Sequence, residues 1–186
     1  MEIITGKTES AHIYSSDEGA LYASIIGPGQ YVLPLGEKLM ANMTSANKVR
    51  LLSGELVMNG RLGRIRPGEY DELDVQNGAS GYNRIDLLVI RYANTNGIES
   101  MTPMVITGES VTGEPSAPTY NTGNIYNGDT PVDFPLYKMQ LTGVSAPTLT
   151  AMFETVDVSL ASIKASLADL EIAQEVKDLY DPVVGS

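Results

Sequence analysis

The sequence predicts a mainly β protein, with an antiparallel, β-sandwich-like domain over residues 1–155 and a C-terminal helix within residues 156–186. Three observations support this fold class. Short apolar runs alternate with clusters of Gly, Pro, Asn and Asp through the first domain, and these residue types favour turns between strands. One run, Arg84 to Tyr92, carries apolar side chains on both faces of a strand. After residue 156 the spacing of apolar residues becomes helical.

The N-terminal half contains several candidate strands. Ala20 to Ile26 is an apolar run that predicts a strand, whereas Gly36 to Met43 fits either a helical turn or a strand. Ser53-Gly54 separates two apolar runs and predicts the turn of a hairpin. The runs expected as strands around and after that turn are Lys48 to Leu52, Glu55 to Met58, Arg61 to Ile65 and Glu72 to Val75.

The strongest strand signal is Arg84 to Tyr92. It places Ile85, Leu87 and Val89 on one face and Leu88, Ile90 and Tyr92 on the other, which predicts a central strand covered on both sides. Ser100 to Gly108 should pair with it across the Asn96-Gly97 turn, at a sheet edge, because Pro103 lacks an N–H. Leu136 to Leu141 and Leu149 to Phe153 complete the predicted strands.

Residues 109–135 predict a long irregular excursion, since they hold four prolines and few aliphatic residues. We expect Tyr120, Tyr126 and Phe134 to tie this segment down. Asp129 and Asp133 lie close to Asn127 and form a weak calcium candidate. Asx-turn hydrogen bonds explain these residues more simply, so we expect no bound metal.

A C-terminal helix is expected from about residue 158 to about residue 180, with Asp157 as N-cap and Pro182 as terminator. Its apolar residues follow the 3-4-3 spacing of a coiled coil over about two heptads. The stripe can pack against sister copies, including as a trimeric coiled coil, or fold back on its own domain. The residues expected to carry oligomerisation are Leu160, Ile163, Leu167, Leu170 and Val176.

The composition argues against several classes of function. The chain of 186 residues has no cysteine and one histidine, His12. This excludes disulfides and thiolate metal sites and disfavours a catalytic triad. No apolar run approaches the ~20 residues of a membrane-spanning helix, and we see no secretory signal. A net charge of −11 disfavours nucleic acid and anionic lipid as direct partners. We expect no cofactor and no enzymatic activity.

Two groups of side chains are candidates for binding. Arg61, Arg64 and Arg66 cluster in an otherwise acidic chain and can contact a carboxylate-rich partner. The simpler alternative is local pairing with acidic residues such as Glu69, Asp71 and Glu72. Three tyrosines are candidates for stacking on saccharide rings, in an alternative function as a carbohydrate-binding module. They are Tyr120, Tyr126 and Tyr137.

Several segments, in this order, resemble a known family. They read YVLPLGEKL (31–39), ELVMNGRLGRIRPG (55–68), NGASGYNRIDLLVIRY (77–92), GIES (97–100) and DFPLYKMQLTG (133–143). The chain from Met1 to Phe153 resembles the N-terminal attachment domain of tail-fibre, baseplate and receptor-binding proteins from phages and prophages of Gram-positive (Firmicutes) bacteria.

The resemblance implies a β-sandwich domain that attaches a tail fibre or receptor-binding module to the phage tail tip. It implies a virion protein, assembled in the bacterial cytoplasm as a homotrimer with other baseplate or tail proteins. It transfers no catalytic residue. No shaft or head follows in this sequence. We therefore expect either a short adaptor or baseplate component, or a receptor-binding part on another chain, so that any cell-wall saccharide is contacted through a neighbouring chain.

Overall fold

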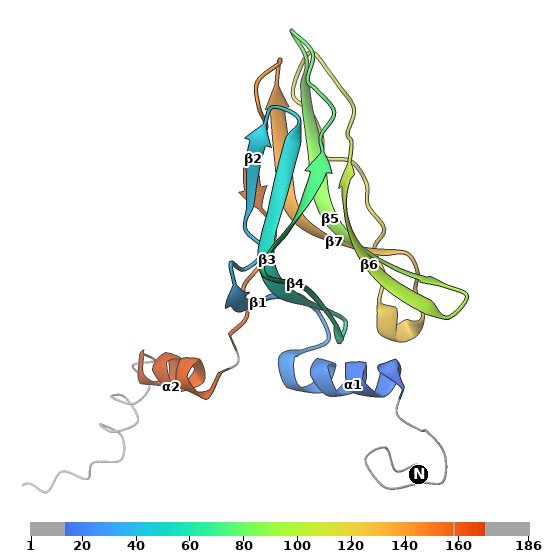
Figure 1. Cartoon of the computed structure of the whole chain (residues 1–186), viewed down its shortest axis with the longest axis vertical. Coiled ribbons are helices and arrows are strands. Elements are labelled where there is room, and N and C mark those ends of the chain that lie inside the picture. Colours follow the sequence, from blue (N-terminus) through green and yellow to red (C-terminus); the bar gives the residue numbers. More distant parts are fainter. Residues whose placement is uncertain (1–13, 158, 170–186) are drawn as a thin grey trace, which may run out of the picture. The chain divides into compact units, whose positions relative to one another are not determined.

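The computed structural model describes residues 14–157 and 159–169. It divides the chain into two compact units, Met1–Val156 and Asp157–Ser186. In its described residues, the first unit consists of two antiparallel four-stranded sheets in a β-sandwich-like arrangement, together with one α-helix and a short 3-10 turn. The mainly β fold is therefore confirmed. Figure 1 shows the strands with the colours of the sequence.

Sheet A is built around one long strand. It contains β1 (Gln30–Gly36), β2 (Ala41–Ser45), β3 (Lys48–Met58) and β4 (Arg61–Asp74). β4 runs along one side of β3, while β1 and β2 share the other side.

The hairpin predicted at Ser53-Gly54 is wrong, because β3 passes through these residues as one strand. They form a bulge instead, and the Ser53 carbonyl accepts the backbone N–H groups of Glu37 and Leu39. The hairpin turn is Asn59-Gly60, where both residues have positive φ (47° and 89°), as a two-residue type I′ turn requires. The two strands expected after it are the ends of the single strand β4.

The sequence did not decide between a helical turn and a strand for Gly36 to Met43. In the structure this segment contains a turn followed by β2. Lys38 and Leu39 both adopt left-handed backbone angles (φ 57° and 54°). These angles are unfavourable for residues with a Cβ. Burial of the Leu39 side chain and its N–H bond to Ser53 offset this cost.

Sheet B has the order β6-β5-β7-β8. Its strands are β5 (Asn83–Thr95), β6 (Ile98–Ile106), β7 (Val132–Thr142) and β8 (Thr148–Ala151). The central position of β5, its turn at Asn96-Gly97 and the edge position of β6 with Pro103 all confirm the sequence predictions.

The core lies between the sheets. β5 contributes Leu88, Ile90 and Tyr92, and β7 contributes Tyr137, whose ring packs edge-on against Phe153. The Tyr137 hydroxyl donates to the Leu39 carbonyl (3.1 Å) and accepts from the Ala41 N–H (3.2 Å), so it links sheet B to the β1–β2 turn of sheet A. Other residues of this cluster include Val32, Val49, Leu51, Leu56, Met58, Leu136 and Met139.

Two ion pairs reinforce sheet B. Asp86 accepts two bonds from Arg84 (2.7 and 3.0 Å), and it also accepts the Gly108 N–H at 2.9 Å. Asp133 accepts two bonds from Arg91 (2.7 and 2.9 Å). Both carboxylates are fully buried. A buried carboxylate stays ionised only with a partner of opposite charge, and the arginine supplies that charge in each pair.

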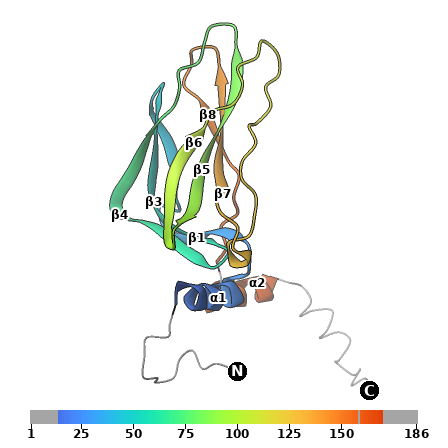
Figure 2. The same ribbon diagram turned by 90° about the vertical axis from the view of Figure 1, so that its right-hand side faces the viewer.

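The irregular excursion is confirmed, although it ends at Pro131, where β7 begins. Val111 forms an isolated bridge to Asn83, and the segment then returns along sheet B (Figure 2). The residue that anchors it is Ile125 in the 3-10 turn η1 (Ile125–Asn127), which is 5% exposed. The expected anchor Tyr126 is instead 69% exposed.

The strand predicted at Ala20 to Ile26 is wrong. These residues form the second half of helix α1 (Ser15–Ile26), which begins with Tyr14 as N-cap and ends at Gly27. Asp17 stabilises the start by accepting the Tyr14 backbone N–H at 2.8 Å. Acidic residues in the first turn also complement the helix dipole.

α1 contacts the β3–β4 turn through glycine. A Cβ built on Gly60 would lie 2.0 Å from the carbonyl oxygen of Gly19, so the two backbones touch. Gly19 is the buried residue of the helix. Any larger residue at position 60 would therefore push α1 away (Figure 1).

After β8 the chain crosses to sheet A. The Val32 N–H donates to the Glu154 carbonyl (3.3 Å), and the Val156 N–H donates to the Val32 carbonyl (3.0 Å). This forms a parallel bridge between Val32 and Thr155. The last residues of the first unit thus pair with its first strand.

The second unit contains helix α2 (Leu160–Asp169). Its cap is Ser159, whose hydroxyl accepts the Ser162 N–H at 3.1 Å, while the expected cap Asp157 accepts the Ser159 N–H. The continuation of the predicted helix to residue 180, with Leu170 and Val176, lies outside the described residues. In the part that the structure describes, no helix is long and apolar enough to cross a membrane.

Candidate functional site

A cavity of about 420 Å³ lies beneath α1 in the first unit. Its walls come from α1, from the turn and start of β4, and from β5 and β6. The polar residues lining it are Ser15, Glu18, Tyr22, Arg61, Tyr92, Glu99 and Ser100.

Glu99 is the centre of the hydrogen bonds in this cavity. Its Oε1 accepts from Arg61 Nε (2.9 Å) and from the Tyr92 hydroxyl (2.7 Å), and its Oε2 accepts from the Ser15 hydroxyl (2.8 Å). Arg61 Nη1 also donates to the Ser15 carbonyl at 3.0 Å. This Glu99 cluster (Ser15, Arg61, Tyr92 and Glu99) therefore holds α1 to three strands. Both oxygens of Glu99 are engaged in this role.

The cluster sets the protonation of its members. Burial would raise the pKa of Glu99, but the hydrogen bonds from Tyr92, Ser15 and Arg61, with the charge of Arg61, outweigh it and hold the pKa below 4.5. Burial and the neighbouring Glu99 raise the pKa of the Tyr92 hydroxyl above 10.0. Glu99 is therefore a carboxylate, and Tyr92 a neutral donor, at neutral pH.

The lowered pKa of Glu99 predicts a pH dependence of stability. In the unfolded chain Glu99 takes up a proton near 4.5, whereas the folded protein takes it up only at lower pH. Between these values the unfolded state binds more protons, so the Glu99 contribution is complete above about pH 4.5 and is lost as the pH falls through the folded pKa. Urea unfolding from about pH 6 to about pH 3 should show wild type losing more stability than Glu99→Gln. Parallel curves would contradict the assignment.

The three candidate arginines have different environments. Arg61 is 18% exposed and its side chain pairs with Glu99. The partner contact expected for it stays a prediction. This ion pair is not the local one expected, because Glu99 lies 38 residues away in the sequence. The side chains of Arg64 and Arg66 have no ion pair or hydrogen bond in the described part of the chain, and both residues are exposed. The local partners expected for the arginines were Glu69, Asp71 and Glu72.

The three candidate saccharide contacts do not form one platform. Tyr137 is 7% exposed and lies in the core, so its assignment to saccharide binding is wrong. Tyr126 lines a cavity of about 310 Å³ beside α1. Tyr120 lines a different one of about 440 Å³ beside Phe134.

The two aspartates of the calcium candidate each have protein partners. Asp129 Oδ2 accepts the Asn124 N–H at 2.8 Å. Asp133 accepts from Asn121 as well as Arg91, and these bonds outweigh burial to lower its pKa below 3.8. Among the described residues no group of three His, Cys, Asp or Glu side chains is placed to hold a metal ion.

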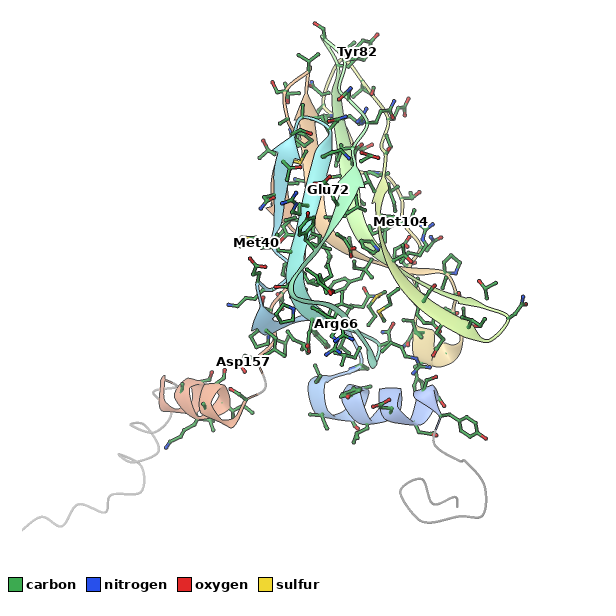
Figure 3. The ribbon with its side chains drawn as sticks, in the orientation of Figure 1. Met40, Arg66, Glu72, Tyr82, Met104 and Asp157 are labelled. Carbon is green, nitrogen blue, oxygen red and sulfur yellow. The ribbon has the colours of Figure 1, made fainter. Side chains whose placement is uncertain are left out.

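The outer face of sheet A carries cross-strand pairs of charged residues from β3 and β4. Lys48 pairs with Asp74 (2.9 Å) and Arg50 with Glu72 (3.0 Å). Arg50 also lies over the ring of Tyr70, 3.9 Å from its centroid. The hydrogen bonds from Arg50, with the charges of Lys48 and Arg50, outweigh burial and lower the pKa of Glu72. Figure 3 shows Glu72 on this strand and Arg66 nearer the α1 end of the sandwich.

Both helices expose apolar side chains. On α2, Ile163 is 46% exposed and Leu167 is 62% exposed. On α1, Leu21 and Ile25 lie one turn apart and are also exposed. The side chain of Leu160 is outside the described set, as are Leu170 and Val176. These helix faces were only partly anticipated, because α1 was expected to be a strand.

Comparison with known proteins adds no assignment. No model of a known protein family matches the chain, and no curated protein is significantly similar to it.

Proposed function

We propose that the chain is a structural component of a bacteriophage tail tip or baseplate, which attaches a tail fibre or receptor-binding apparatus. In this role the β unit docks on neighbouring tail proteins. The C-terminal helix joins copies of the chain into a homo-oligomer, which we expect to contain three copies.

The observation that carries the proposal is the uncovered apolar stripe of α2. Ile163 and Leu167 lie four residues apart on one helix face, and both are exposed. Burying such a side chain contributes roughly 1.5–3 kcal/mol. The sequence spacing predicts that Leu170 and Val176 extend this stripe and add to the seam that sister helices can share. The Glu99 cluster supports a binding role over catalysis, because its carboxylate oxygens are occupied in holding a helix.

The test is the mass of the full chain in solution. Wild type is expected to form a homo-oligomer by light scattering. Ile163→Asp with Leu167→Asp should shift the mass to a smaller species, because it places charges in the apolar seam. The matched control is Ala161→Asp with Ala165→Asp, which has the same spacing and charge on the opposite, exposed face. A wild-type monomer at high concentration, or equal loss in the control, would refute association through this helix.

The position in the virion needs a separate test. Electron microscopy of phage particles carrying a tagged copy of the chain should show the tag at the tail tip. Absence of the chain from purified particles would exclude the proposed function, whatever its oligomeric state.

A further inference from the structure

The outer face of sheet A is only partly covered, since Val57 is fully buried there while its neighbours on β4 are exposed. The outer face of sheet B is covered. On sheet B, Leu87 and Val89 point away from the core cluster and are still fully buried, on the side along which the 109–131 segment runs. On sheet A, Leu62 is 43% exposed and Tyr70 is 51% exposed. Both lie on β4, opposite Val57 and Leu52 of β3.

Met40 extends this apolar surface. It is 52% exposed, and its carbonyl accepts the Leu52 N–H at the end of the β1–β2 turn. Its neighbour Ala41 pairs with the buried Leu51, so strand alternation places Met40 on the outer face. Figure 3 labels Met40 at the margin of the sandwich. Exposed apolar side chains gathered on one sheet face are typical of an interaction surface.

One cross-strand pair on this face is left open. Glu55 of β3 lies directly opposite Arg64 of β4, just as Lys48 lies opposite Asp74 and Arg50 opposite Glu72. The other two pairs form ion pairs. Glu55 and Arg64 form none, with each other or with any other described residue. The open pair lies between the apolar pairs formed by Tyr70 with Leu52 and by Leu62 with Val57.

We propose that a second copy of this chain covers the sheet A face, defined as Met40, Glu55, Leu62, Arg64 and Tyr70, by a twofold contact. In a twofold interface the same patch of both copies is in contact. Each contact therefore occurs twice, because a residue of the first copy touches the second copy in the same way as the same residue of the second copy touches the first. Glu55 of each copy then pairs with Arg64 of the other, and the apolar side chains above and below the pair become buried.

Charge favours this occupant. The chain carries a net charge of −11, so two copies repel each other over most of their surfaces. The open pair contributes one charge of each sign and Arg66 adds another cation nearby, so the sheet A face is a place where two copies attract. This contact is separate from the proposed helix contact and does not depend on the phage assignment.

The test uses the full chain carrying Ile163→Asp and Leu167→Asp, which removes the helix contact. Analytical ultracentrifugation over a concentration series is expected to show a monomer–dimer equilibrium. Glu55→Arg or Arg64→Glu alone should raise the dissociation constant by at least about tenfold, because each opposes like charges across the twofold axis. The double exchange, Glu55→Arg with Arg64→Glu, should restore it.

The control is Glu114→Arg, which makes the same charge change at an exposed residue of the 109–131 segment, outside this face. It should leave the dissociation constant unchanged. Circular dichroism spectra of the single variants that match wild type exclude misfolding, which restoration alone does not, because Glu55 and Arg64 also face each other within one copy. The proposal would be overturned if the Ile163→Asp, Leu167→Asp chain stays monomeric, or if the single exchanges change the dissociation constant no more than Glu114→Arg does. Neither result bears on the helix contact, which has its own test.

Discussion

Replacing Asp86 with alanine is expected to lower the free energy of unfolding by about 3–5 kcal/mol, since it leaves a buried arginine without its counter-ion. Arg84 is 4% exposed and Asp86 is 0% exposed. Two hydrogen bonds join them, and Asp86 also accepts the N–H of Gly108, just beyond β6. Urea unfolding followed by circular dichroism measures the loss.

Two further variants define the cause. Asp74→Ala breaks an exposed pair with Lys48, and we expect it to change stability little. Arg84→Met with Asp86→Leu removes both buried charges and should recover most of the lost stability, because no uncompensated charge remains. If Asp86→Ala costs no more than Asp74→Ala, the buried pair does not stabilise the sandwich.

Gly60→Ala is expected to be the most damaging change at a turn. Its φ of 89° is unfavourable for alanine, at a cost of about 1–2 kcal/mol. The added Cβ would also lie 2.0 Å from the Gly19 carbonyl oxygen, which is backbone and cannot rotate away. We therefore expect α1 to leave its position, in addition to the strain in the turn.

The chain offers a matched control at the other type I′ hairpin. Gly97 has a φ of 83° and follows Asn96, as Gly60 follows Asn59, but a Cβ there would meet nothing within 4 Å. Gly97→Ala should show the backbone strain alone. Hydrogen exchange in Ser15–Ile26 should rise in Gly60→Ala only. Equal exchange in both variants would show that the glycine contact does not position the helix.

Local signals predicted the centre of the fold. Alternating apolar residues and the Asn96-Gly97 turn identified β5 and β6, because a strand with two buried faces leaves an uninterrupted apolar run. The apolar run at residues 20–26 was wrongly predicted to be a strand, because an uninterrupted apolar run is also typical of a buried strand. The acidic first turn, which marks the start of helix α1, lies before this run. At Ser53-Gly54 the turn residues form a bulge, and the N–H groups that bind there belong to Glu37 and Leu39.

The candidate site was only partly predictable. Arg61 was identified as a notable cation, but its partner Glu99 is 38 residues away and Ser15 is 46 residues away. Nearer carboxylates made a local pairing more plausible. Only the tertiary fold brings the hairpin turn, β6 and α1 together. Arg64, by contrast, was already a candidate, and its register opposite Glu55 is the observation on which the proposed twofold contact depends.

The bridge between Val32 and Thr155 has a mechanical consequence. Two backbone hydrogen bonds join β1 to the residues that lead out of the β unit. Tension between the segments that flank this unit is therefore transmitted along β1 and across these bonds in shear. Once α1 has left its contacts, a tether pulled at both ends loads this short parallel seam next, while the hairpins and the core lie outside the direct path of the force.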